Sequence, residues 1–377
     1  MMFKIMKSNI LFFYSFFFLA TLLLPGCDEN LRFFAGGFTV EQEKGFSVYD
    51  LNSRNSIPAK VSDWDAGPSP AYFCFDKKRN LIYLLNGVRE FRGLPGSGVT
   101  TMKYNPETDS MEKMGEILVP YGGACYISLS AERQYLFFAS YSSGSAAVVK
   151  LDGNGIPERV TDAVLFAPES PGLSHPHMIS PDPSGKYVYM TDLGLDRILK
   201  YEFDATSGRL ILPSDGITEL LKGSGPRHFE FNKDGSKMYV INELGSTIMV
   251  FNINESGNLS LQQIVPTVTK GFEGKNACAD IHLGRDCKYL YGSNRGENSI
   301  VVFRVSDEGT LTLAGHVTCG GDWPRNFVID PSGKHLVVGN ERSNHISVFR
   351  INNKTGIPEG PLTHLPMKKP ACIKFWN

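Results

Sequence analysis

The chain has 377 residues, and its 38 basic and 39 acidic side chains leave a formal net charge of −1. Because the two signs are mixed along the chain, no basic stripe is available for a phosphate backbone, and a nucleic-acid partner is disfavoured. A chain of this length usually forms two or three domains, but a ring of repeats has no internal boundary and remains one unit.

The first 27 residues differ from the rest of the chain. Two lysines precede an apolar run over residues 10–24, and the run ends in Leu-Pro-Gly before Cys27. This pattern predicts a lipoprotein signal peptide over residues 1–26 and a mature chain that begins with lipidated Cys27. Acyl chains on this cysteine would hold the protein on a membrane of the cell envelope, since each buried CH₂ contributes about 0.8 kcal/mol. The alternatives are an uncleaved helical anchor and an ordinary secretory signal.

Residues 27–377 are interpreted as one domain of β-strands. Two β-rich runs come first, Arg32–Phe38 and Gly45–Leu51, and they look like a blade without its first strand. A longer unit then recurs, and its clearest copy is Gly225–Phe251: a proline, an alternating run, a polar turn, a β-rich run, a second polar break and another β-rich run. The alternation and the β-branched and aromatic residues favour successive antiparallel strands.

The spacing from proline to turn glycine fixes the register of the copies. It is the same in Pro176–Gly185, Pro226–Gly235 and Pro324–Gly333. The other copies start at Pro70, Ala124, Ala277 and Pro370. A period of about fifty residues is typical of propeller blades, and the last copy stops after one strand. The sequence therefore predicts an all-β, seven-bladed propeller in which the C-terminal strand joins the N-terminal blade and leaves no open sheet edge.

Two columns of residues are expected at one face of the ring, around the mouth of the central channel. The first column follows the start of each copy and contains Ala71, Cys125, His177, Arg227, Cys278, Arg325 and Ala371. The second column lies at the end of the second strand and contains Tyr141, Asp192, Glu243, Asn294 and Asn340. Because converging loops build propeller sites at this mouth, His177, Arg227 and Glu243 are predicted to meet there as catalytic residues.

Further polar side chains near the same face are predicted to bind substrate. They are His175, Asp192, His228, Asn242, His282, Arg295, Arg325 and Asn326. Asp280 lies at the same face. Any one of these side chains is also explained by a hydrogen bond that fixes a neighbouring loop, and Asp280 and His282 in particular could be structural. The cysteines after Cys27 show no metal-binding spacing and are interpreted mostly as core thiols; they are Cys74, Cys125, Cys278, Cys287, Cys319 and Cys372.

The motifs that are missing narrow the chemistry. The sequence has no Gly-X-Ser-X-Gly elbow, no cluster with metal-ligand spacing and no phosphate-binding loop before a helix. A site of histidine, arginine and glutamate, without metal or cofactor, suits general acid/base work on a reactive electrophile such as a lactone. His177 would activate water or protonate the leaving oxygen, with a pH dependence near neutrality. Arg227 would stabilise an oxyanion or hold a carboxylate or phosphate.

Five segments carry a resemblance to a known family: Gly225-Pro226-Arg227-His228, Asn242-Glu243-Leu244, Asp192–Arg197, Ala279–His282 and Pro324–Phe327. Together, over about residues 31–377, they resemble the seven-bladed propeller lactonases, which include propeller-type 6-phosphogluconolactonases and fungal carboxy-cis,cis-muconate cyclases. The resemblance implies a lactonase or lactonising site at the channel mouth. It also implies a small-molecule lactone as the partner and His177, Arg227 and Glu243 as the reacting groups.

The signal peptide departs from the family's cytoplasmic members. Phosphogluconolactone is made inside the cell, so a non-phosphorylated aldonolactone suits an envelope enzyme better. Two other functions remain open on the sequence alone. One is an envelope propeller that binds a ligand or a protein without turnover, since one fold hosts many functions. The other is a muconate-type cyclase that uses the same groups in reverse.

Overall fold

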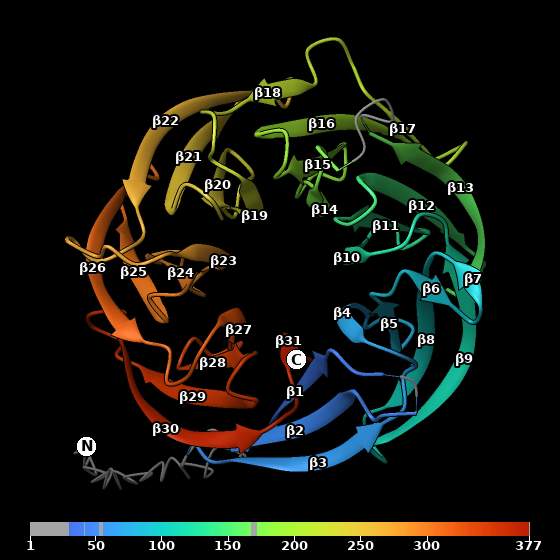
Figure 1. The fold of residues 1–377 in the computed structure, drawn as a ribbon, viewed down its shortest axis with the longest axis horizontal. Coiled ribbons are helices and arrows are strands. Elements are labelled where there is room, and N and C mark those ends of the chain that lie inside the picture. The colour runs from blue at the N-terminus through green and yellow to red at the C-terminus, as the bar shows by residue number, and fades with distance from the viewer. Residues whose placement is uncertain (1–29, 41, 53–55, 167–171, 377) are drawn as a thin grey trace, which may run out of the picture.

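The computed structural model describes residues 30–40, 42–52, 56–166 and 172–376. These residues form seven blades of β-sheet around a central axis (Figure 1), which confirms the predicted all-β propeller. In the described part of the chain, no helix is long and apolar enough to cross a membrane. Cys27 and the predicted signal peptide over residues 1–26 lie outside the described residues.

Both ends of the chain build the first blade. Its strands, from the axis outward, are β31 (Pro370–Phe375), β1 (Asn30–Gly37), β2 (Phe46–Asn52) and β3 (Pro58–Trp64). The C-terminal strand pairs antiparallel with β1 over Phe33–Gly37. The Phe33 ring contacts Tyr49 and Phe375, with ring centroids 4.9 and 5.5 Å apart. The predicted closure by the C-terminal strand is therefore confirmed.

Consecutive stretches of chain form the other six blades. Blade two contains β4 (Pro70–Asp76), β5 (Leu81–Asn86), β8 (Ser97–Asn105) and β9 (Ser110–Val119), with a side hairpin of β6 (Glu90–Phe91) and β7 (Leu94–Pro95). Blade three contains β10 (Ala124–Leu129), β11 (Tyr135–Ser140), β12 (Ser145–Leu151) and β13 (Pro157–Leu165). Blade four contains β14 (Pro176–Pro181), β15 (Tyr187–Asp192) and β16 (Arg197–Asp204), with β17 (Arg209–Ile211) and β18 (Ile217–Glu219) at its outer edge.

The last three blades repeat the four-stranded pattern. Blade five contains β19 (Pro226–Phe231), β20 (Lys237–Asn242), β21 (Thr247–Ile253) and β22 (Leu259–Pro266). Blade six contains β23 (Ala277–Leu283), β24 (Tyr289–Arg295), β25 (Ser299–Val305) and β26 (Leu311–Thr318). Blade seven contains β27 (Pro324–Ile329), β28 (His335–Asn340), β29 (His345–Ile351) and β30 (Pro358–Pro366).

The inner strands of a blade are more deeply buried than the outer ones. Every residue of β5 and of β15 is buried, because neighbouring blades cover both faces of a second strand. In the outer strand β22, covered and exposed residues largely alternate, as expected for a strand with one face in solvent. Tyrosine hydroxyls fasten one blade to the next: Tyr83 donates to the carbonyl of Gly155 at 2.7 Å, and Tyr189 donates to that of Gly257 at 2.6 Å. All six described cysteines are free thiols and four are buried, which confirms the interpretation as mostly core thiols.

The innermost strands carry β-bulges where they reach one face of the ring. In six blades the strand pairing skips the residue that follows the first residue of the repeat. The skipped residues are Ala71, Cys125, His177, Arg227, Arg325 and Ala371. A bulged residue has no partner in the ladder, and its side chain is aimed away from the regular alternation. All six line one pocket.

Blade six is offset by one residue from the predicted alignment. Cys278 pairs with Asn294 in the way that Pro226 pairs with Asn242. The prediction that this copy starts at Ala277 is therefore wrong by one position, and the copy starts at Cys278.

This offset changes which side chains of blade six point to the pocket. Cys278, which was predicted in the first column, is buried, and its sulfur lies 3.1 Å from the hydroxyl of Thr267. Ala279 occupies the position that corresponds to Arg227 in blade five. Asp280 follows it, at the position that corresponds to His228. Because side chains alternate along a strand, a one-residue shift moves each of them to the other face.

Candidate active site

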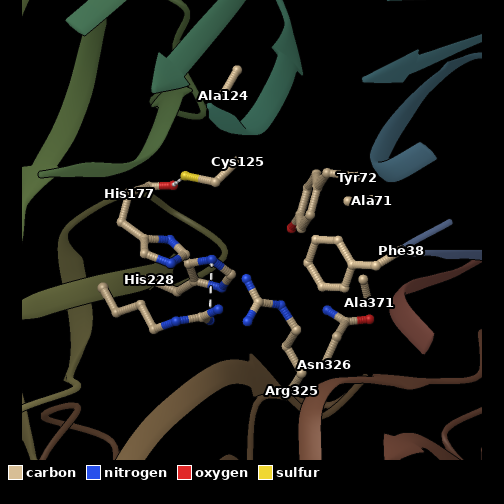
Figure 2. Close-up of a pocket in the computed structure, with 11 residues that line it drawn as sticks. Phe38, Ala71, Tyr72, Ala124, Cys125, His177, His228, Arg325, Asn326 and Ala371 are labelled. Carbon is tan, nitrogen blue, oxygen red and sulfur yellow. Dashed lines mark hydrogen bonds between the residues drawn. The ribbon is translucent and has the colours of Figure 1, made fainter. Parts of the chain in front are cut away.

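A small pocket lies where the bulged residues converge (Figure 2). Its lining residues are Phe38, Ala71, Tyr72, Ala124, Cys125, His177, Arg227, His228, Arg325, Asn326 and Ala371. Figure 2 shows His177 and His228 on one side and the rings of Tyr72 and Phe38 on the other, with the guanidinium of Arg325 between them. The structure thus brings His177 and Arg227 into one pocket, from adjacent blades.

Arg227 is the most deeply placed cation of the site, with 2% of the residue exposed. Its Nη1 donates to the carbonyl oxygen of Ala279, and its Nε lies 3.1 Å from Oε2 of Glu243. Burial lowers the pKa of Arg227 to about 9, and repulsion from Arg295 and Arg325 acts in the same direction. The guanidinium therefore remains cationic at neutral pH while its charge is only partly balanced.

Glu243 lies between two arginines. Its Oε2 forms ion pairs with Nε of Arg227 at 3.1 Å and with Nη2 of Arg295 at 2.6 Å. Arg295 also donates to the carbonyl oxygens of Ala277 and Cys278 at 3.1 and 2.9 Å. Glu243 is therefore placed beside Arg227 as its column position indicates, and its carboxylate holds both guanidinium groups in place.

Arg325 adds a third cation at the pocket. Its Nη1 contacts Oε2 of Glu341 at 3.4 Å, and its guanidinium lies 4.9 Å from the centroid of the Phe38 ring. Three arginines thus surround two carboxylates at this rim. Fixed cations in a pocket with little solvent attract anionic groups and developing negative charge.

His177 is almost fully buried, and its Nδ1 has no hydrogen-bond partner within the described part of the chain. The ring meets those of His228 and Tyr141 edge to face, with centroids 5.0 and 5.8 Å away. Burial, and then the charge of Arg227, hold the pKa of His177 well below its ordinary value. The expected titration near neutrality therefore moves to lower pH, and the imidazole is neutral at pH 7.

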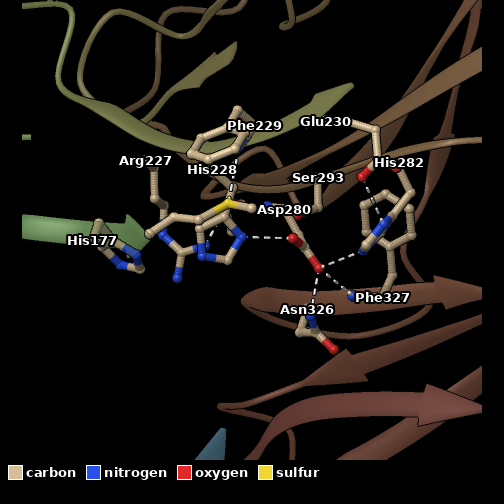
Figure 3. Close-up of polar contacts among 12 residues, drawn as sticks. His177, Arg227, His228, Phe229, Glu230, Asp280, His282, Ser293, Asn326 and Phe327 are labelled. Atoms are coloured by element: carbon tan, nitrogen blue, oxygen red, sulfur yellow. Dashed lines mark hydrogen bonds and ion pairs between the residues drawn. The ribbon is translucent and has the colours of Figure 1, made fainter. Parts of the chain in front are cut away.

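His228 is paired with the carboxylate of Asp280, which on the sequence alone could be a structural residue (Figure 3). Its Nδ1 lies 2.7 Å from Oδ1 of Asp280, and its Nε2 lies 3.4 Å from Nη1 of Arg227. Burial lowers the pKa of His228 to about 4, and Arg227 contributes to the same shift, while Asp280 opposes it. His228 is therefore also neutral at pH 7.

Asp280 connects several predicted residues into one network. Its Oδ2 accepts from Nδ2 of Asn326, from the backbone N–H of Phe327 at 3.3 Å and from Nε2 of His282 at 3.1 Å. Burial alone would raise the pKa of Asp280, but the charge of His282 and the hydrogen bonds keep it well below its ordinary value. The sequence places Asp280 among the polar side chains of this face and in the segment Ala279–His282, but the register offset hides its contact with His228.

His282 lies behind Asp280 and does not line the pocket. Its Nδ1 is 3.6 Å from Oε2 of Glu230. Burial alone would lower the pKa of His282, but the charge and hydrogen bond of Asp280, together with Glu230, raise it to about 10. A protonated His282 therefore balances the charge of Asp280, which makes it a supporting residue.

Three predicted substrate-binding residues fix loops around the mouth. His175 stacks on the Tyr141 ring at 4.4 Å, and its Nδ1 lies 2.9 Å from the Tyr141 carbonyl oxygen. Asp192 is fully buried and accepts from Ser174 Oγ and from the backbone N–H of His175, both at 2.8 Å. Asn242 is also fully buried and donates to Thr247 Oγ1 at 3.0 Å.

The second predicted column combined two different positions. Asp192, Asn294 and Asn340 are fully buried strand-end residues, and the two asparagines donate to loop carbonyls at 2.8 and 3.2 Å. Tyr141 and Glu243 each come one residue after a strand end, outside β11 and β20. Since consecutive residues of an extended chain point to opposite sides, only the later position turns toward the mouth.

The described residues contain no group of three His, Cys, Asp or Glu side chains placed to hold a metal ion. The polar side chains of the pocket are instead arranged as cations, neutral imidazoles and carboxylates that hold them. Such an arrangement can stabilise an oxyanion and exchange a proton with a bound molecule.

Comparison with known proteins places this arrangement in a family. A family model described as "Lactonase, 7-bladed beta-propeller" matches residues 32–375. An uncharacterized protein of Staphylococcus aureus strain USA300 is 31% identical over 333 residues, which are 86% of this chain and 93% of the relative. An uncharacterized protein of Lactococcus lactis is 29% identical over 327 residues, which are 85% of this chain and 92% of the relative.

Solved structures agree with this result. A Bacteroides fragilis protein proposed to be a 6-phosphogluconolactonase has a TM-score of 0.84 and 28% identity, covering 93% of this chain and 99% of the other. The periplasmic gluconolactonase of Pseudomonas aeruginosa has a TM-score of 0.84 and 25% identity, covering 92% of this chain and 99% of the other. The chain therefore belongs to the seven-bladed β-propeller lactonase family.

Proposed function

We propose that the protein hydrolyses a sugar-derived lactone in the pocket that His177, Arg227 and His228 line. The observation that carries the proposal is the buried Arg227, which Glu243 fixes at 3.1 Å beside two neutral imidazoles. Fixed N–H donors aimed at developing negative charge, next to a proton acceptor, are what ester hydrolysis needs. The names of two structural neighbours, a gluconolactonase and a proposed 6-phosphogluconolactonase, support the same substrate class.

The reaction follows from these roles. Water attacks the lactone carbonyl carbon, and an imidazole takes its proton while Arg227 stabilises the negative charge on the carbonyl oxygen. The ring C–O bond then breaks, and the leaving oxygen receives the proton. Oxyanion donors of this kind contribute about 10²–10³-fold in rate, and positioned proton transfer contributes about 10²–10⁴-fold.

Glu243 acts on this reaction through the arginines it holds. Its carboxylate contacts both Arg227 and Arg295, so we assign it the placement of the two cations. His177, Arg227 and Glu243 thus remain the proposed catalytic group. His228, Arg325 and Asn326 complete the proposed substrate contacts because they line the same pocket.

We further propose that the protein works in the cell envelope, held there through Cys27, on a lactone without a phosphate group. The apolar run over residues 10–24 before Cys27 supports the anchor. The periplasmic location in the name of the Pseudomonas aeruginosa neighbour supports the compartment. A 6-phosphate would be the mark of an intracellular substrate.

A lactone panel tests the activity and the substrate together. Glucono-lactone and other aldonolactones, each with and without a 6-phosphate, are added to purified protein, and acid release is followed at constant pH. Because these lactones also open spontaneously, the rate is compared with buffer and with the Arg227→Ala protein. We expect acid release well above both blanks, with a higher kcat/KM for the lactone without phosphate.

Two results of the panel would redirect the assignment. If a lactone binds but its opening is never faster than the blank, the protein is a binding propeller. If the protein instead closes an unsaturated dicarboxylate to a lactone, it is a lactonising cyclase.

A further inference from the structure

The two ring nitrogens of His228 face different surroundings. Nδ1 lies 2.7 Å from Oδ1 of Asp280, on the side away from the pocket, and Nε2 lies toward Arg227 and the pocket. An ionised carboxylate can only accept hydrogen bonds, so Nδ1 must carry the proton. The neutral ring then directs the lone pair of Nε2 toward the pocket, where Nη1 of Arg227 donates to it in a long contact of 3.4 Å that the attacking water has to replace.

Burial and several hydrogen bonds fix the side chain of Asp280 in one orientation. The carboxylate is buried, with 2% of the residue exposed. It accepts from His228, His282 and Asn326 side chains and from the N–H of Phe327. Its own backbone N–H donates to Ser293 Oγ at 2.9 Å. With so many donors, the carboxylate cannot turn without breaking several hydrogen bonds, so the plane of the His228 ring is fixed too.

We propose that His228 is the catalytic residue that removes the proton from the attacking water, and that Asp280 is the positioning residue that fixes its tautomer and orientation. This inference rests on the proposed lactone hydrolysis. It moves His228 from substrate binding to proton transfer, and it gives Asp280 a role in the site.

The proton balance is complete with this single imidazole. Water gives one proton to Nε2 of His228 as its oxygen bonds to the carbonyl carbon. The imidazolium, held by Asp280 through Nδ1–H, returns that proton to the ring oxygen as the C–O bond breaks. The product is the open hydroxy acid, and His228 ends in its starting form.

His177 is less suited to this step. No carboxylate contacts its ring, and its Nδ1 is unpartnered among the described residues, so nothing fixes one tautomer or stabilises the imidazolium. A neutral ring that can carry its proton on either nitrogen serves as a hydrogen-bond donor to the carbonyl or leaving oxygen. The two histidines, with ring centroids 5.0 Å apart, therefore have different roles: His228 transfers the proton, and His177 donates a hydrogen bond.

The kinetic test compares two buried Asp–His pairs. Asp330 lies at the opposite face of blade seven, equally buried, with Oδ2 3.4 Å from Nδ1 of His335. We expect Asp280→Asn and His228→Gln each to lower kcat by on the order of 10²–10⁴ with KM changed less than about threefold. Asp330→Asn should lower the thermal stability about as much as Asp280→Asn does, but it should leave kcat unchanged. The double variant Asp280→Asn/His228→Gln should be no slower than His228→Gln alone, because both changes remove the same step.

A spectroscopic test reads the tautomer of His228 directly in the wild-type protein. In protein labelled with ¹⁵N-histidine, the His228 signals are assigned by their loss in His228→Gln. At pH 7 we expect a protonated Nδ1 and an unprotonated Nε2. A proton on Nε2 instead would overturn the role of Asp280, as would Asp280→Asn and His228→Gln proteins that open lactones at the wild-type rate. If the wild type opens no lactone at all, the proposed function fails, and the tautomer still decides whether Asp280 orients His228.

Discussion

Arg227 is the side chain that we propose stabilises the negative charge of the transition state. It is buried, and Glu243 and the carbonyl oxygen of Ala279 hold it. We expect Arg227→Ala to lower kcat/KM by about 10²–10³ on the best lactone of the panel. Arg227→Lys should recover little, because an ammonium lacks the planar fork of the guanidinium.

A matched arginine on the outside of the ring provides the control. Arg304 is exposed, and its guanidinium lies 5.4 Å from the Tyr289 ring centroid, far along blade six from the pocket. Arg304→Ala should keep the wild-type kcat/KM. A folded Arg227→Ala protein with the wild-type rate would remove Arg227 from the mechanism.

The histidines around Asp280 make stability depend on pH in two directions. The pKa of His282 is raised from 6.5 to about 10, so its stabilisation is complete below pH 6.5 and is lost as the pH rises through 10. In the folded protein the pKa of His228 is lowered from 6.5 to about 4. As the pH drops from 6.5 toward 4, this histidine is protonated in the unfolded chain but not in the folded one, so the free energy of unfolding falls.

The measurement is the urea midpoint of unfolding as a function of pH. We expect its maximum near pH 6.5, with a decline on each side. His282→Gln should flatten the alkaline decline, and His228→Gln should flatten the acid one. A profile that neither variant changes would show that these two groups do not titrate as described.

The catalytic candidates could be predicted from the sequence because the repeat supplies a register. Counting from the prolines places His177 and Arg227 in one column, and the structure finds both at bulges of one pocket. The contact of Asp280 with His228 could not be predicted in this way, since blade six has no proline at its start and the count was off by one residue. The sequence also does not show that burial lowers the pKa values of His177 and His228 below the ordinary range of an imidazole.

At the level of secondary-structure elements, the strand β31 stabilises both the first blade and the pocket. Its residue Ala371 lines the pocket. The backbone N–H of Ile373 donates to Oδ1 of Asn326 at 2.6 Å, and Asn326 donates to Asp280. The C-terminal strand is therefore connected through two hydrogen bonds to the carboxylate that orients His228.

Deletion of residues 370–377 should consequently disrupt the whole protein. Without β31, the ladder edge of β1 and the apolar rings of Phe33 and Phe34 lose their cover. We expect aggregation or a broad, non-cooperative thermal transition in calorimetry. A truncated protein that melts as sharply as the full chain, at the same temperature, would mean that the ring does not depend on this strand.

Element order and closure could be predicted because each blade repeats the same turns and strands, and an unpaired last strand has one evident place. The bulges could not, because a bulge adds one residue without changing the hydrophobic pattern around it. They nevertheless decide which side chains leave the sheet. In blade four, for example, the bulge at His177 is what separates a pocket residue from the core residue Met178.

At the level of the whole molecule, the proposed anchor concerns a part of the chain outside the described residues. If Cys27 is lipidated, Cys27→Ser should move the protein from the membrane fraction to the soluble fraction of broken cells. The lactonase activity of the released protein should equal that of the anchored one, because residues 32–375 match the family without the N-terminal segment. A Cys27→Ser protein that still sediments with membranes would point to a helical anchor instead.

The closure of the ring also has a consequence for biosynthesis. The pocket takes Phe38 and Ala71 from the first two blades and Ala371 from β31, which is made more than 300 residues later than Phe38. Until translation reaches the final strand, Asn326 lacks the N–H of Ile373 and the first blade lacks its innermost strand. A chain that lacks β31, through early termination or proteolysis, would thus lack the finished site, so catalytic turnover would show that β31 has been made and has joined the ring.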